Sequence, residues 1–466
     1  MKSKKKYLIA IIIPVLVLAG LIGISFHPAG NRMLTAAGKL FESRPAGDAS
    51  ASAGSPASES LSPELPDTAA PDSVPESAPA PAPTPEPVPS STPEPAFEEY
   101  DITLLAVGDN LMHMGIVRTG QMSDGTRDYA FLFENIRSCL EAADISIINQ
   151  ETILGGNELG FSGFPLFNSP TEVGDAIAEA GFDVVLHATN HAADQGLEGI
   201  LNCAAYWKEA HPEILMTGIA GTDTAADAAG SIPLLETGGV TFAILNYTYG
   251  PNAETLAFPL RGHLNMLCAY NEKNGRIDFT SLNPRVLEDI ELAKQLADIV
   301  IVFPHWGTEY QKNPSTYQRK FALEMTEAGA DLIIGTHPHV PQPVEKITAD
   351  NGNTALCYYS LGNYVSTQKQ ALCMLEEMAW VTFHVSEDGV AIAEEQTGAL
   401  PLVCHYTSGP VRLENIYFLE DYTEEQAARH GIRSYGGVAL KRSDLQAWSD
   451  EIIGDWTLKK SDLSVD

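Results

Sequence analysis

From Tyr100 onward the chain alternates short apolar runs with segments of helical spacing, and this alternation limits the possible folds more than any other feature. Apolar runs typical of strands occur at 101–109, 145–151, 184–191, 240–250, 299–307, 332–339 and 354–363. Helical spacing fills many of the intervals, as in 171–183, 283–298 and 318–331. Such alternation predicts an α/β fold with at least partly parallel sheets. The stretch from Ala379 to His405 is typical of a β meander, and the tail beyond Asp421 is typical of helices.

The first residues of the chain predict a membrane anchor. A basic cluster, Lys2 to Lys6, precedes twenty uncharged residues, Tyr7–Phe26. About 20 apolar residues span a hydrocarbon core of roughly 30 Å, and basic flanks stay on the cytoplasmic side. We therefore interpret 1–6 as a cytoplasmic flank and 7–26 as a transmembrane signal-anchor helix. A cleaved signal peptide is the alternative, although its apolar core is normally shorter.

Residues 27–99 have the composition of a disordered stalk, rich in Pro, Ala, Ser and Glu. Fourteen of the 30 prolines fall between Pro45 and Pro95. Such a segment buries too little apolar surface to fold and favours extended polyproline II. The predicted organisation continues with a folded domain over 100–420 and a helical extension over 421–466. We expect a single-pass protein of the cell membrane whose C-terminal domain lies outside the cytoplasm.

The charge of the chain excludes nucleic acid as a partner. The formal net charge is −33, of which residues 1–41 contribute +6 and residues 42–99 contribute −10, which leaves −29 for the remainder. A phosphate-binding surface needs an excess of Lys and Arg. The six cysteines lack zinc-type spacing. We predict free, buried thiols, although a location outside the cytoplasm also permits disulfides.

Nearly every predicted strand ends in a side chain that can bind a metal ion. These residues are Asp109, Asn149, Glu151, Asn190, His191, His305, His337 and His339. Ligands of open α/β sheets bind beyond the carboxyl ends of the strands, so these loops should converge. Carboxylate, amide and imidazole ligands suit Mn, Fe or Zn. The number of ligands is sufficient for two divalent ions, an arrangement that lowers the pKa of a bound water.

Each of these residues also has a structural interpretation when it is taken alone. Asp109 can cap a helix, and His305 can be a hydrogen-bonded core histidine. Asn149 and Asn190 can satisfy the backbone of a turn. The HPH triplet at 337–339 is a stronger signal, because a rigid proline between two imidazoles can present both rings together. The occurrence of such residues at five strand ends favours a metal centre.

At these residues the sequence resembles the CapA family of capsule and poly-γ-glutamate biosynthesis proteins. The matching motifs, in the family's order, are LLAVGDNLMH, INQE, ATNHAADQG, HWGTEY, IIGTHPHVPQP and YSLGNY, and they span Leu104 to about Tyr364. The resemblance implies that 100–420 is a metallophosphoesterase-like domain, with a layered α/β/β/α sandwich fold. It extends to the metallophosphoesterase blocks DxH, GDxx(D/E), GNH(D/E) and GHxH. One departure is that Leu111 replaces the histidine of DxH.

The resemblance implies a role for each candidate residue. The metal ligands would be Asp109, Glu151, Asn190, His305, His337 and His339, with Glu151 in the bridging position. His191 would donate a proton to the leaving group, a role that suits imidazole near neutral pH. Asp194 would orient His191 or, alternatively, cap the following helix. His113 and Asn149 are possible additional ligands, and His113 would compensate for the missing DxH histidine.

The resemblance also implies a function and its partners. It predicts a metal-dependent hydrolase-type domain, with two divalent ions of Mn, Fe or Zn, in the synthesis or export of an anionic surface polymer. The substrate would be that polymer or a phosphoester, and the partners would be the membrane and polymer-synthesis membrane proteins. A domain of charge −29 would repel a polyanion except at the metal centre. The alternative is a non-catalytic metal-binding scaffold or export subunit, which the missing DxH histidine favours.

Overall fold

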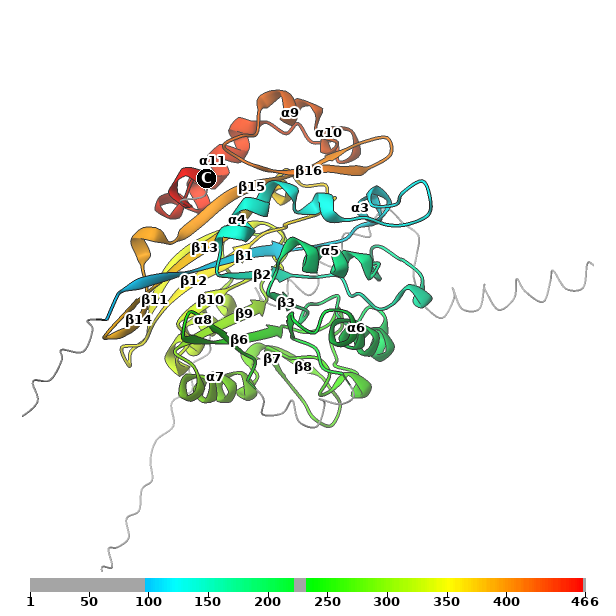
Figure 1. Cartoon of the computed structure of the whole chain (residues 1–466). Coiled ribbons are helices and arrows are strands. Elements are labelled where there is room, and N and C mark those ends of the chain that lie inside the picture. Colours follow the sequence, from blue (N-terminus) through cyan, green and yellow to red (C-terminus); the bar gives the residue numbers. More distant parts are fainter. Residues whose placement is uncertain (1–96, 222–231, 464–466) are drawn as a thin grey trace, which may run out of the picture. The chain divides into compact units, whose positions relative to one another are not determined.

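Two β-sheets pack face to face in the part of the chain that the computed structural model describes, residues 97–221 and 232–463 (Figure 1). The first sheet has the order β16-β15-β13-β1-β2-β3-β4, with β14 paired to β13. Its strands are β1 (Tyr100–Asp109), β2 (Ile145–Asn149), β3 (Val184–Leu186), β4 (Leu215–Thr217), β13 (Leu375–Ser386), β14 (Gly389–Ile392), β15 (Gly398–Thr407) and β16 (Arg412–Phe418). Strands β1 to β4 are parallel, and β13 to β16 pair antiparallel, as the predicted meander requires.

The second sheet has the order β11-β12-β10-β9-β6-β5. Its strands are β5 (Leu234–Thr237), β6 (Val240–Thr248), β9 (Ile299–His305), β10 (Leu332–Ile334), β11 (Pro341–Thr348) and β12 (Thr354–Leu361). The central strands β6, β9, β10 and β12 are parallel, and the edge strands β5 and β11 are antiparallel. A separate hairpin pairs β7 (Cys268–Tyr270) with β8 (Ile277–Leu282).

Helices cover the outer faces of the two sheets. The helices are α3 (Met114–Thr119), α4 (Arg137–Ala142), α5 (Glu172–Ala180), α6 (Gly196–Ala210), α7 (Pro284–Leu296), α8 (Thr316–Ala328), α9 (Glu424–Arg429), α10 (Ile432–Tyr435) and α11 (Arg442–Ile452). Helix α7 contacts β6 and β9, and α8 contacts β11 and β12. Helix α8 begins at a capping box, in which Ser315 and Gln318 satisfy each other's backbone N–H groups.

The alternation of side chains along β1 explains the layers. Leu104 and Ala106 belong to the core between the sheets, whereas Leu105 and Val107 belong to the outer core, which also contains residues of α4 to α8. Across the inner core, the rings of Phe242 in β6 and Phe383 in β13 lie 5.2 Å apart. The described residues therefore form helix, sheet, sheet and helix layers. This mixed α/β architecture fits the metallophosphoesterase-like fold that the motifs predict.

Several predictions fall on other parts of the chain. The flank 1–6, the anchor 7–26 and nearly all of the stalk 27–99 lie outside the described residues. Within 97–221 and 232–463, no helix has the length and apolar character that a membrane span requires.

All six cysteines are free and buried, as predicted. Burial raises the pKa of the Cys203 thiol, in α6, to about 12.

Glu377 places a carboxyl group on the face of β13 that carries Ala379 and Val381, inside the core between the sheets. Its side chain is fully buried, and neither carboxyl oxygen has a hydrogen-bond partner. Burial first, and the neighbouring Glu376 second, raise the pKa of Glu377 well above 4.5. The folded state therefore holds a proton that the unfolded chain releases above that pH. Stability from this group is greatest at low pH and is lost as the pH rises toward the folded-state pKa.

We expect Glu377→Gln to remove this pH dependence, because the amide does not titrate. Each proton bound only by the folded state changes the unfolding free energy by about 1.4 kcal/mol per pH unit. Between pH 5.5 and 7.5 the native protein should therefore lose up to about 2.7 kcal/mol more stability than the variant. Urea denaturation at both pH values measures the difference, with the exposed Glu387→Gln as control. Equal pH dependence in native protein and variant would contradict the expectation.

Candidate metal centre

The six predicted ligands come together at the carboxyl ends of the parallel strands of both sheets. Asp109 and His305 are the last residues of β1 and β9. Glu151 and Asn190 follow β2 and β3, and the HPH triplet at 337–339 follows β10. All six are buried. The first sheet thus supplies the carboxylate and amide oxygens, and the second sheet supplies the imidazoles.

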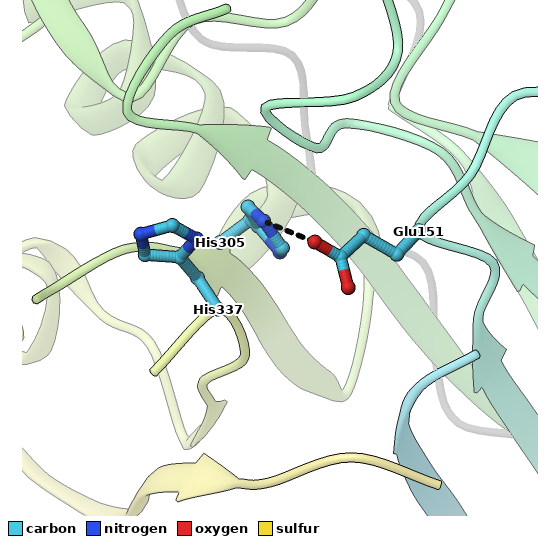
Figure 2. Close-up of side chains that lie close together, drawn as sticks. All are labelled: Glu151, His305 and His337. Atoms are coloured by element: carbon cyan, nitrogen blue, oxygen red, sulfur yellow. Dashed lines mark ion pairs between the residues drawn. The ribbon is translucent and has the colours of Figure 1, made fainter. Parts of the chain in front are cut away.

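Glu151 belongs to two groups of candidate ligand atoms. One group is Glu151, His305 and His337, which Figure 2 shows, and the other is Asp109, Glu151 and His339. Within each group the ligand atoms lie within 4.8 Å of one another. Glu151 Oε1 lies 3.9 Å from His305 Nε2 and 3.8 Å from His339 Nε2. A carboxylate in this place can bridge two cations.

The unpaired polar atoms of the centre fit a divalent cation. Both carboxyl oxygens of Glu151 and the Nδ1 atom of His337 are buried without a hydrogen-bond partner. A buried carboxylate without a partner costs several kcal/mol, on the order of the effective desolvation penalty of an ion. Oxygen and imidazole donors at this spacing are suitable ligands for Mn, Fe or Zn. The residues therefore fit the metal ions that the sequence predicts.

The ionisation of the centre without a cation supports the same interpretation. Burial first, and the charge of Asp109 second, raise the pKa of Glu151 well above its usual value. Burial opposes the charged form of His339, but Glu151 and the hydrogen bond to Asp109 outweigh it and raise the pKa of His339 to about 10. Burial and neighbouring imidazoles lower the pKa of His305 and His337 well below 6.5. Positive charge is thus favoured at the centre, and two rings are neutral, as metal ligation requires.

Hydrogen bonds orient two imidazoles of the centre, and Thr336 and Asn363 contribute to them from outside the candidate ligand set. His305 Nδ1 lies 2.9 Å from Thr336 Oγ1, which leaves Nε2 facing Asn190 Oδ1 at 2.8 Å. His339 Nδ1 lies 3.0 Å from both Asp109 Oδ2 and Asn363 Oδ1. Partners of this kind fix the tautomer and orientation of a metal-binding histidine. The motifs contain Thr336 and Asn363, but sequence reasoning assigned neither a role.

The backbone at the HPH triplet is strained. His337 and His339 have φ values of 94° and 59°. A non-glycine residue in this region costs about 1–3 kcal/mol and persists only where its surroundings hold it. The backbone N–H of His337 donates to the Asp109 carboxylate, at 3.3 Å to Oδ1 and 3.2 Å to Oδ2. The two strained residues are also the ones whose rings belong to the groups of candidate ligands.

The two possible additional ligands differ in their positions. Asn149 donates its amide to Asp109 Oδ1 at 2.8 Å, and its own Oδ1 is buried without a partner. His113 belongs to neither group of ligand atoms. Its Nδ1 lies 3.3 Å from Leu111 O, and its ring lies 5.5 Å from Phe167. Burial, with His339 nearby, lowers the pKa of His113 to about 3. We therefore place His113 beside the centre and Asn149 against Asp109.

His191 and Asp194 form a hydrogen-bonded pair beside the ligands. His191 Nδ1 lies 2.7 Å from Asp194 Oδ2, which also accepts the backbone N–H of Phe167 at 2.7 Å. Helix α6 has Gln195 at its N-cap, without a side-chain cap bond. The helix-cap alternative for Asp194 is therefore wrong, because its carboxylate faces His191 instead. A buried carboxylate at Nδ1 leaves Nε2 of the ring for proton transfer.

The sequence is similar to a protein family and to known proteins. A family model described as "Bacterial capsule synthesis protein PGA_cap" matches residues 103–368, which include all six predicted ligands. The chain is 29% identical over 242 residues to the PGA biosynthesis protein CapA of Bacillus subtilis (strain 168), a match that covers 52% of this chain and 56% of that protein. It is 33% identical over 224 residues to the capsule biosynthesis protein CapA of Bacillus anthracis, with coverage of 47% and 48%. The chain thus spans about half the length of the curated relatives it matches.

Two solved structures have limited structural similarity to the chain. A hypothetical protein from Thermus thermophilus is similar at 15% identity and a TM-score of 0.33, and the match covers 64% of this chain and 99% of that chain. A 5'-nucleotidase from Candida albicans is similar at 11% identity and a TM-score of 0.28, with coverage of 62% and 48%.

Proposed function

The chain belongs to the bacterial capsule synthesis protein family PGA_cap, and on that premise we propose that it is a metal-dependent hydrolase-type protein of surface-polymer synthesis or export. Its substrate is an anionic surface polymer of the poly-γ-glutamate kind or a phosphoester that belongs to the same process. The proposal joins family membership to the chemistry of the centre. The family match covers residues 103–368, and the proposal applies the function to the whole chain.

The observation that carries the proposal is the position of Glu151 between two groups of imidazole and carboxylate ligands. Its two buried, unpaired oxygens are placed as in a bridging ligand. A nearby positive charge would offset the cost of burying this carboxylate. The ions would be held by Asp109, Glu151 and His339 on one side and by Glu151, His305, His337 and Asn190 on the other. Two divalent cations bound there would supply Lewis-acid charge to a phosphoryl or acyl oxygen and to the attacking water.

The protein's own groups then provide proton transfer. Asp194 holds His191 by its Nδ1 atom, so that the Nε2 atom carries the proton that the leaving group receives. A positioned general acid contributes about 10²–10⁴-fold to the rate. His191 is only 6% exposed, which limits competing proton transfer to bulk water.

The predicted anchor supports a location at the outer side of the cell membrane. Residues 1–6 and 7–26 would hold the chain in the membrane, and the stalk would extend the domain away from it. Polymer-synthesis membrane proteins are the proposed neighbours there. The acidity of the domain, −29 after residue 99, restricts contact with a polyanion to the cation-bearing centre.

A non-catalytic scaffold or export subunit is the second candidate function. The observation that favours it is Leu111, a buried apolar residue at the position of a metallophosphoesterase ligand histidine. His113 does not replace it in either ligand group. In this case the centre would bind metal only to hold the structure or the polymer.

The test is a joint measurement of metal content and turnover. We expect the purified chain to retain Mn, Fe or Zn in elemental analysis, and to hydrolyse bis(4-nitrophenyl) phosphate or a γ-glutamyl peptide. His337→Ala should lose both, whereas the control His384→Ala, at a half-buried position outside both ligand groups, should lose neither. A metal-free native protein would sink the proposal. Bound metal without turnover of either substrate would favour the scaffold.

A further inference from the structure

Asn252 contacts both the ligand set and the general acid. It follows β6, in a loop that no sequence motif marks as functional, and its side chain is exposed. Asn252 Oδ1 accepts the amide of Asn190 at 3.0 Å. Its Nδ2 atom lies 3.4 Å from His191 Nδ1. A single exposed residue therefore lies against both a candidate metal ligand and the candidate proton donor.

The first contact favours one orientation of the Asn190 amide, which also contacts His305 Nε2 and the Tyr249 side chain. The oxygen and nitrogen of an asparagine amide are nearly the same size, so their hydrogen-bond partners decide which one faces a site. The carbonyl oxygen of Asn252 can only accept, and it therefore selects the Nδ2 side of Asn190. This leaves Asn190 Oδ1 directed at His305 Nε2, at 2.8 Å, in the group that contains Glu151. An oxygen in this position can bind a cation, whereas an amide nitrogen cannot.

The second contact leaves an N–H donor on an exposed residue beside the centre. His191 Nδ1 lies 2.7 Å from Asp194 and directs its proton there, so it has no lone pair for Asn252. The Nδ2 hydrogens of Asn252 are then available to an oxygen of a bound substrate, next to the leaving group.

The loop that carries Asn252 is held at both ends. Tyr249 N donates to His305 O at 2.9 Å, and Gly250 N donates to Thr248 Oγ1 at 3.3 Å. On the far side, Ile277 N donates to Glu254 O at 3.0 Å. The backbone that carries Asn252 is thus held before any ligand binds, which lowers the cost of ordering the loop.

We propose that Asn252 is a positioning residue that sets the metal-facing oxygen of Asn190 and donates a hydrogen bond to a substrate oxygen beside His191. This inference rests on the proposed function, because it requires that Asn190 binds a cation. It predicts two separable effects, one on metal affinity and one on turnover.

Two variants separate these effects. Asn252→Leu removes both the acceptor and the donor, and Asn252→Asp keeps an acceptor for Asn190 but removes the donor. By calorimetric titration with Mn²⁺, we expect Asn252→Leu to bind roughly 10–100-fold more weakly, the usual effect of losing a partner that orients a ligand. Asn252→Asp should bind at least as tightly as the native protein. With bis(4-nitrophenyl) phosphate, kcat/KM should fall in both variants.

The control is Asn313→Leu, the same substitution at another exposed asparagine, which should leave both quantities unchanged. Native-like Mn²⁺ affinity in Asn252→Leu would overturn the positioning role while leaving the proposed function intact. Unchanged kcat/KM in Asn252→Asp would overturn the donor role. Absence of Mn²⁺ binding by the native protein would instead overturn the proposed function, and this inference with it.

Discussion

Glu151→Gln is expected to abolish divalent metal binding at both ligand groups while the folded protein remains intact. The substitution keeps the shape of the side chain but removes the charge that the two groups share. Loss of a residue that only orients a ligand weakens metal affinity roughly 10–100-fold, so loss of a shared ligand should exceed about 100-fold. Titration with Mn²⁺ or Zn²⁺ measures the effect, and elemental analysis gives the residual content.

The stability of the metal-free variant distinguishes this result from unfolding. Because neither Glu151 oxygen has a hydrogen-bond partner, the substitution breaks no hydrogen bond, and the variant should remain folded in the presence of a chelator. Metal should stabilise the native protein and leave Glu151→Gln unchanged. Glu158→Gln, at an exposed position close in sequence, is the matched control. Retention of native affinity by Glu151→Gln would refute the bridging role.

His191→Gln should lower kcat by about 10²–10⁴-fold without loss of bound metal, because a positioned general acid contributes that much to rate. The loss should be largest for substrates with poor leaving groups, since 4-nitrophenolate departs without much protonation. A series of phosphodiesters with leaving groups of increasing pKa measures this dependence. A role confined to substrate binding would raise KM equally across the series.

The chain offers a second histidine–carboxylate pair as a control for this substitution. His211 Nε2 lies 2.9 Å from Asp175 Oδ1, outside the metal centre. His211→Gln should therefore leave kcat and metal content unchanged. An equal loss of kcat in the His191 and His211 variants would show that the effect is not specific to the centre.

The convergence of the candidate ligands could be predicted because each of them lies at or shortly after the end of a strand. The run 101–109 corresponds to β1 (Tyr100–Asp109), and parallel pairing brings its last residue beside those of its neighbours. The predicted run 184–191 is strand only over β3, because the chain then leaves the ladder. There Ala188 N donates to the side chain of Asn246, at 2.7 Å.

The remaining features depend on contacts that no local pattern encodes. Asn252 meets Asn190 from 62 positions away in the chain, so neither residue signals the other. Adjacent Glu376 and Glu377 point to opposite faces of β13, yet both are fully buried. Which side of a strand faces the interior depends on the whole sheet. The sequence patterns therefore predict the strand ends of the centre better than its supporting hydrogen bonds.

Because the candidate ligands are divided between the two sheets, metal ions bound there would cross-link the tertiary structure. Ions held by oxygens from one sheet and imidazoles from the other would resist any sliding of the sheets across their shared apolar interface. Metal binding and folding are thermodynamically linked. Metal binding would therefore stabilise the correct alignment of the two sheets by the same free energy by which the correct alignment strengthens metal binding. Metal occupancy and the stability of the sandwich would thus be linked, and metal depletion would lower that stability.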